Sequence, residues 1–142
     1  MCMRYLGVFF LLVAILSTGS CKAVTTTVAE RCVLLDLPVQ RGSELLPMLE
    51  EFALKNELDV DLSNPAVARY TRGERLRPSS YLGYTMGMGD FGAVLSLFRF
   101  ERPQDADLLD SFDRFVEDEV APRYRVTLCS EVPDFQPPVV YR

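Results

Sequence analysis

The sequence predicts an α+β fold in which two helices cover one face of an antiparallel sheet. Three observations support this. Strand-like and helix-like segments alternate along residues 32–132, two segments carry apolar residues at helical spacing, and residues 81–101 place two strand-like runs, the second apolar on both faces, around a glycine-rich turn. With 49% apolar residues in 142, the chain can build one domain with a substantial core.

The first half of the domain is predicted to be strand, helix and short strand. Residues 32–39 alternate as a strand does. Ser43 is then expected to cap a helix that runs to about residue 56, with Pro47 early enough to be accommodated. The apolar stripe of this helix consists of Leu45, Met48, Leu49, Phe52 and Ala53. Residues 58–62 alternate again, and their two aspartates should face water.

The second half is predicted to be a hairpin, a helix and a last strand. Residues 81–101 form the hairpin, and the Gly-Asp-Phe-Gly turn at residues 89–92 supplies glycines for positive φ. A second helix is expected over residues 103–120 and a last strand over residues 125–132. The helix stripe consists of Leu108, Leu109, Phe112, Phe115 and Val116.

This order of elements gives a ferredoxin-like βαββαβ sandwich with one additional short strand. In that arrangement the first and last strands are antiparallel neighbours, and Cys32 and Cys129 share the face away from the helices. No zinc-type CxxC spacing is present in the sequence. A disulfide between these two cysteines is therefore predicted; two buried free thiols are the alternative.

The helix-free face of the sheet is predicted to be a binding surface. We place Leu34, Ala93, Leu95 and Leu97 on it, beside Gly83 and Gly87. Such an apolar face requires a cover. The proline-rich tail, with Phe135 and Tyr141 as anchors, a second copy of the chain, or another protein could supply it.

The N-terminal segment has the pattern of a targeting signal. Arg4 precedes an apolar run over residues 6–16, whose 11 residues fall short of the roughly 20 that span a membrane. Small residues then lead into Cys21. This segment resembles the lipobox of bacterial lipoproteins, although Thr18 stands where that family usually has leucine. The resemblance implies that residues 1–21 are a signal and that Cys21 carries acyl chains. Residues 22–31 are polar and rich in threonine, so we expect them to tether a domain over residues 32–142.

Two alternatives for this segment remain open. Ordinary signal cleavage after Ala23 would give a soluble periplasmic or secreted protein, and an uncleaved anchor is the third reading. All three place the domain outside the cytoplasm. The expected location is the periplasmic side of the cell envelope. The resemblance to lipoproteins implies the outer membrane, because Lys22 rather than aspartate follows Cys21.

Composition excludes several activities. Without residues 1–21 the chain has 14 basic and 20 acidic residues, and this net charge of −6 disfavours nucleic-acid binding. The chain has no histidine, so catalysis through histidine is ruled out. Residues 87–94 spell GxGxxGxV, but neither a kinase nor a dinucleotide fold fits around them. The aspartates lack calcium-loop spacing. We expect no catalytic residues, no cofactor and no metal.

Residues 66–80 are the least regular part of the sequence and are predicted to form a loop. This loop holds four arginines, Arg69, Arg72, Arg75 and Arg77, which suit carboxylates, phosphates or lipid headgroups or form a solvated surface. The predicted function is a membrane-tethered, non-enzymatic interaction or structural module of the bacterial envelope. The alternatives are an inhibitor or immunity-type protein and an enzyme that works without histidine.

Overall fold

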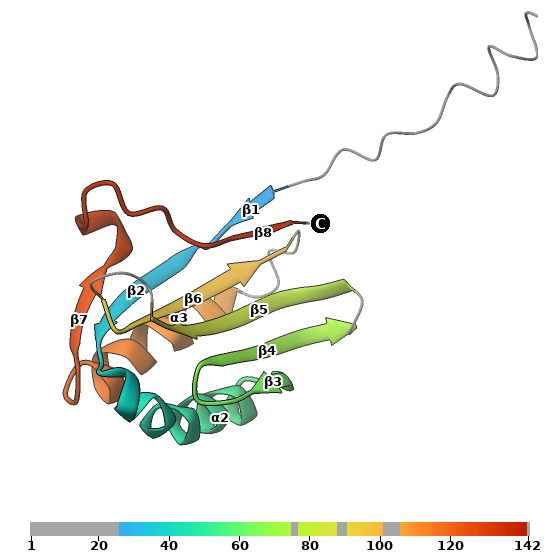
Figure 1. Ribbon diagram of the computed structural model, residues 1–142. Coiled ribbons are helices and arrows are strands. Elements are labelled where there is room, and N and C mark those ends of the chain that lie inside the picture. The colour runs from blue at the N-terminus through green and yellow to red at the C-terminus, as the bar shows by residue number, and fades with distance from the viewer. Residues whose placement is uncertain (1–25, 75–76, 88–90, 101–105, 142) are drawn as a thin grey trace, which may run out of the picture.

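The computed structural model describes residues 26–74, 77–87, 91–100 and 106–141. Within these residues, six strands form an antiparallel sheet and two more form a separate ribbon (Figure 1). The sheet contains, in spatial order, β3 (Asp59–Ser63), β4 (Val67–Glu74), β5 (Arg77–Met86), β6 (Ala93–Arg99), β2 (Arg31–Asp36) and β7 (Arg125–Leu128). The ribbon pairs β1 (Thr26–Val28) with β8 (Val139–Tyr141).

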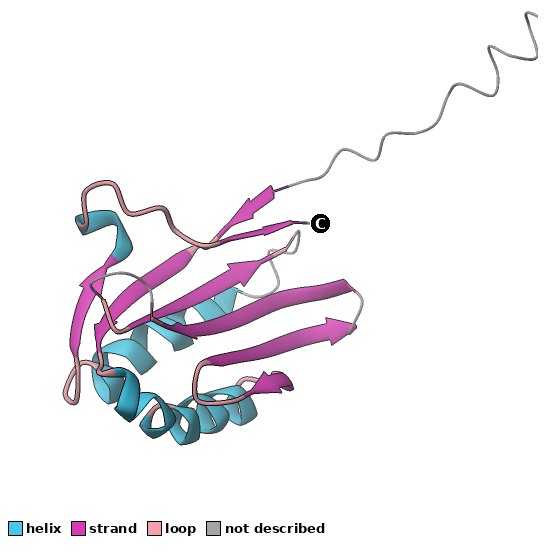
Figure 2. Cartoon of the chain, in the orientation of Figure 1, coloured by secondary structure: helices cyan, strands magenta, loops and turns pink. Residues whose placement is uncertain are grey.

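Two α-helices, α2 (Leu46–Lys55) and α3 (Ala106–Phe115), cover one face of the sheet (Figure 2). A π-helical segment, Val116–Val120, extends α3, and short 3₁₀ helices occupy Val39–Glu44 and Cys129–Glu131. The fully buried centre of the core includes Leu35, Leu49, Tyr70, Tyr84, Leu95 and Phe112. The predicted α+β class, with two helices on an antiparallel sheet, is confirmed.

Both predicted helix stripes are confirmed, but the start of the first helix is not. Leu45, Met48, Leu49, Phe52 and Ala53 are all buried, as are Leu108, Phe112 and Phe115. Ser43 does not cap α2, because it lies inside the preceding 3₁₀ helix. The N-cap is Leu45, which makes no side-chain capping bond.

The predicted loop over residues 66–80 is wrong in the structure. β4 pairs with β5 from Val67, opposite Thr85, to Glu74, opposite Arg77. The segment therefore adds a strand, and four strands rather than three lie between the helices along the chain. The ferredoxin-like sandwich with one short extra strand does not describe this arrangement. Hydrophobic alternation is hidden here because the residues that face the helices include small Ala68 and polar Tyr70.

The edges of the domain also differ from the prediction. Residues 26–31, predicted to be part of a tether, form β1 and the start of β2. The first and last strands of the sheet are antiparallel neighbours as predicted, with Val33 opposite Leu128. The last strand is shorter than expected, because the chain turns into a 3₁₀ helix at Cys129.

The predicted hairpin is confirmed: β5 and β6 are antiparallel partners, with Leu82 opposite Leu97. Residues 88–90 of its turn lie outside the described residues. Gly92, the last glycine of the GxGxxG pattern, lies against the backbone of Leu37, where an added Cβ would come within 1.7 Å of the carbonyl oxygen. Close packing therefore accounts for this glycine.

Candidate functional site

The helix-free face of the sheet carries Leu34 and Val94, and the C-terminal segment covers them with Val132 and Phe135. Phe135 also meets the ring of Phe91 edge-on, with centroids 6.4 Å apart. The tail is thus one cover of this face through Phe135, as predicted, whereas the other predicted anchor, Tyr141, is 70% exposed.

Three residues assigned to this face are on the other one. Ala93, Leu95 and Leu97 are buried in the core beneath the helices, whereas Val94 packs on the helix-free side. β6 is apolar on both faces, so hydrophobic alternation could not decide its orientation. The register decides it, because Leu97 is opposite the core residue Leu82.

The predicted disulfide joins Cys32 of β2 to Cys129 directly after β7, with Cα atoms 5.4 Å apart. Cys129 packs against Leu34 and Val94, on the helix-free side of the sheet. The bridge closes a segment with a sequence separation of 97 residues. It therefore ties the first strand of the sheet to the start of the C-terminal segment.

A cavity of about 370 Å³ lies beside the disulfide, between the sheet edge and the C-terminal segment. It is lined by Ala29, Glu30, Arg31, Cys32, Leu128, Cys129, Ser130, Val132, Phe135 and Pro137. Most of these residues present apolar or sulfur atoms. Sequence reasoning missed the cavity because the tail forms one wall, and only Phe135 as a predicted anchor pointed to it.

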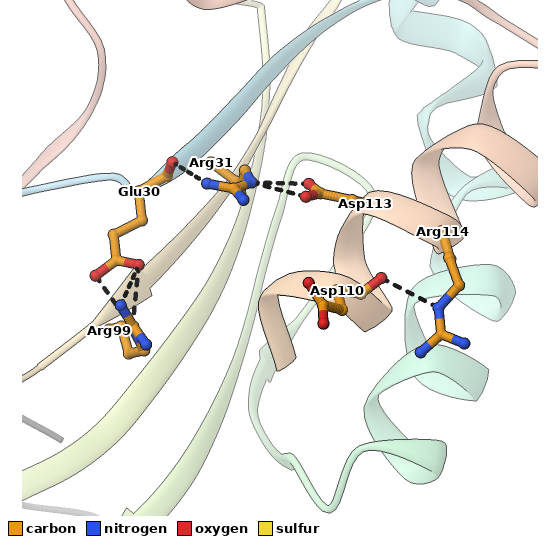
Figure 3. Close-up of polar contacts among 6 residues, drawn as sticks. All are labelled: Glu30, Arg31, Arg99, Asp110, Asp113 and Arg114. Atoms are coloured by element: carbon orange, nitrogen blue, oxygen red, sulfur yellow. Dashed lines mark hydrogen bonds and ion pairs between the residues drawn. The ribbon is translucent and has the colours of Figure 1, made fainter. Parts of the chain in front are cut away.

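The two charged residues of the cavity, Glu30 and Arg31, have partners outside it (Figure 3). Arg31 Nε donates to both carboxylate oxygens of Asp113, at 2.8 and 3.0 Å. The hydrogen bond that Arg31 donates to the Asp113 carboxylate raises the pKa of Arg31. Arg99 Nε likewise donates to both oxygens of Glu30, at 3.1 and 3.0 Å. These pairs offset the charges of Glu30 and Arg31 at this end of the cavity.

Figure 3 also shows a local contact on α3, where Arg114 Nε donates to the carbonyl of Asp110 at 3.3 Å. Asp110 and Asp113 of α3 are both exposed. Asp113 has in addition the structural role of holding β2 against α3.

The three described arginines of the set proposed as a partner surface do not form one patch. Arg72 points to the end of α2, where its Nε donates to the Asn56 carbonyl at 3.0 Å. Arg69 pairs with Asp61 at 3.2 Å on the neighbouring strand. Arg77 is exposed at the start of β5, and Arg75 lies outside the described residues. The described arginines of the set thus occupy separate positions along the β4–β5 hairpin.

Cys21, the predicted lipidation site, also lies outside the described residues. Among the described residues, no helix combines the length and the hydropathy that crossing a membrane requires. In the same part of the chain, cysteine and acidic side chains form no group of three or more suited to a metal ion.

Comparison of the chain with models of protein families, with curated proteins and with solved structures finds no match. The residues themselves must therefore support any proposal about function.

Proposed function

We propose that this protein is a membrane-tethered, non-enzymatic binding module of the bacterial cell envelope, anchored on the periplasmic side through Cys21. The lipobox-like segment supports the anchor. The Cys32–Cys129 disulfide supports a location outside the cytoplasm, because such bonds persist in oxidising compartments. No cofactor is required for this role.

The observation that carries the binding role is the cavity beside the disulfide. At about 370 Å³ it lies within the range of ligand sites, and a few polar groups surround its apolar wall. Glu30 and Arg31 are already in ion pairs, so a charged ligand would have to compete with Arg99 and Asp113. An apolar side chain from a protein partner suits the cavity better, since it buries against Leu128, Val132 and Phe135 without breaking these pairs.

Photo-cross-linking in intact envelopes tests this role. A photoreactive amino acid at Leu128, which is half-exposed and lines the cavity, should form an adduct with a protein partner. Filling the cavity with Ser130→Trp should suppress that adduct. A reporter at Leu54, which is 81% exposed on α2, is the matched control and should not form it. The same adducts from both positions, or none from Leu128, would place binding elsewhere.

The anchor is tested separately by fractionation. Cys21→Ser should move the chain from the membrane fraction to the soluble fraction, because acyl chains then no longer hold it. Unchanged membrane association would favour an uncleaved anchor. A wild-type chain already in the soluble fraction would favour the inhibitor or immunity-type alternative.

A further inference from the structure

We propose that the exposed face of the β1–β8 ribbon rests on the membrane surface and orients the domain on the bilayer. This inference rests on the proposed anchor at Cys21, and it assigns a contact surface and an orientation that the anchor alone does not supply.

Pairing in the ribbon puts three apolar side chains on one face. Thr26 lies opposite Tyr141 and Val28 opposite Val139, and directly opposed residues of an antiparallel pair project to the same side. All four are exposed; Val28, Val139 and Tyr141 are exposed at 52%, 40% and 70%. Three of the eight exposed large hydrophobic residues found in the described parts of the chain therefore share this small face.

The other side of the ribbon faces the domain. Thr27 and Val140 are opposite each other and half-buried. Pro138, Val139 and Val140 line a hollow of about 90 Å³ with Phe98 and Gly83 of the sheet, and Val139 remains 40% exposed. The ribbon therefore has an inner side that is packed and an outer side that lacks a cover among the described residues.

The short segment between Cys21 and the ribbon limits how far the ribbon can lie from the membrane. Five peptide units separate Cys21 from Thr26, so they span at most about 18 Å when fully extended. An acylated Cys21 at the bilayer surface holds Thr26 within that distance. Figure 1 shows the ribbon on the side of the molecule away from α2, so this end of the domain is the one brought to the membrane.

The uncharged outer face of the ribbon suits contact with lipid headgroups. Thr26, Val28, Val139 and Tyr141 carry no charge. A tyrosine ring has an apolar body and a polar tip, which suit the interface between the membrane and water. Val60, by contrast, stands between Asp59 and Asp61. A chain with an acidic excess approaches an anionic surface best through an uncharged face.

Quenching by brominated lipids tests this orientation on the full lipidated chain. The chain is reconstituted in vesicles of phosphatidylethanolamine and phosphatidylglycerol with brominated acyl chains. A fluorescent amino acid replaces Tyr141, and a matched chain carries the same reporter at the exposed Leu54. We expect quenching at position 141 to exceed that at position 54 at least threefold. Adding Val28→Asp and Val139→Asp should reduce the difference to less than half, with flotation unchanged.

Flotation of the vesicles separates the outcomes. A chain that floats but shows equal quenching at both positions keeps its anchor and overturns the orientation. A chain that does not float overturns the anchor and this inference with it. A third outcome concerns a second copy of the chain. If the protein in detergent has the mass of a dimer and its reporter at position 141 is shielded from aqueous iodide, the second copy covers the ribbon and the membrane contact is wrong.

Discussion

The guanidinium of Arg72 closes the C-terminal end of α2. Its donor bond to the Asn56 carbonyl satisfies one of the acceptors that a helix leaves open, and its charge complements the negative end of the helix dipole. Arg72 also lies 3.8 Å from Asp107 of α3. This arginine is therefore structural, and a test of the whole arginine set as a binding surface would confuse folding with recognition.

We predict that Arg72→Met lowers the free energy of unfolding by about 1.5 to 3 kcal/mol, the range for a hydrogen bond to a charged group. Arg77→Met, at an exposed position of the same hairpin, is the control and should change it by less than about 0.5 kcal/mol. Urea titration of both variants measures the difference. Equal stability of the two would remove the capping role from Arg72.

Tyr84 gives the domain a dependence on alkaline pH. Its side chain is fully buried, its hydroxyl donates to the Gly42 carbonyl at 3.1 Å, and burial raises its pKa to about 12. In the unfolded chain a tyrosine ionises near pH 10. Between these values the unfolded state loses protons that the folded state retains, so stability decreases as pH increases.

The measurement is the urea midpoint at pH 8, 10 and 11. The wild type should lose stability between pH 10 and 11, and Tyr84→Phe should lose less over the same interval. A part of the dependence should persist in the variant, because burial also raises the pKa of Tyr70 and Tyr81. Identical pH profiles would contradict the role of Tyr84.

At the scale of elements, Gly92 sets how closely the β5–β6 turn approaches the end of β2. A Cβ at this position would enter the Leu37 backbone, which cannot move without shifting β2. At Gly83 the nearest atom, 2.8 Å away, is Cε1 of Tyr81, which belongs to a side chain rather than to the backbone. Gly92→Ala should therefore cost at least about 3 kcal/mol or prevent folding, and Gly83→Ala about 1 kcal/mol or less.

Thermal unfolding of both alanine variants distinguishes the two sites. A melting temperature for Gly92→Ala close to that of Gly83→Ala would show that the turn can move away from Leu37.

The disulfide holds β2, β7 and the C-terminal segment together. For a closed segment of 97 residues, the chain-entropy model gives about 4 to 5 kcal/mol of stabilisation. A double variant, Cys32→Ala with Cys129→Ala, should lose a stability of this order in urea titration. Alkylation of the unreduced protein should label neither cysteine. Labelling of both in the folded protein would mean that the bond is absent.

Strong periodicity explains which elements could be predicted from the sequence. Both helices and the β5–β6 hairpin follow from apolar spacing and turn residues. β4 does not, because Ala68 and Tyr70 conceal its inward face, and its stability derives from backbone pairing with β5. β1 and β8 are three residues each and pair although they lie near opposite ends of the sequence. No local sequence pattern predicts such a pair.

For the whole molecule, the sequence predicted the cysteine pair of the candidate site but not its cavity or the ribbon. The pair follows from counting cysteines and placing two strands side by side. The cavity depends on how the tail folds back over Leu34 and Val94, and the ribbon depends on both ends of the domain meeting. Such long-range contacts follow from the assembled sheet rather than from neighbouring residues.

The central claim is that the domain is held at the envelope by Cys21. Mass spectrometry of the N-terminal peptide from membrane-extracted protein tests this most directly. We expect the chain to begin at Cys21 and to carry a diacylglyceryl group and an N-acyl chain. A chain that begins at an unmodified Val24, after cleavage behind Ala23, or that retains residues 1–20 would contradict it.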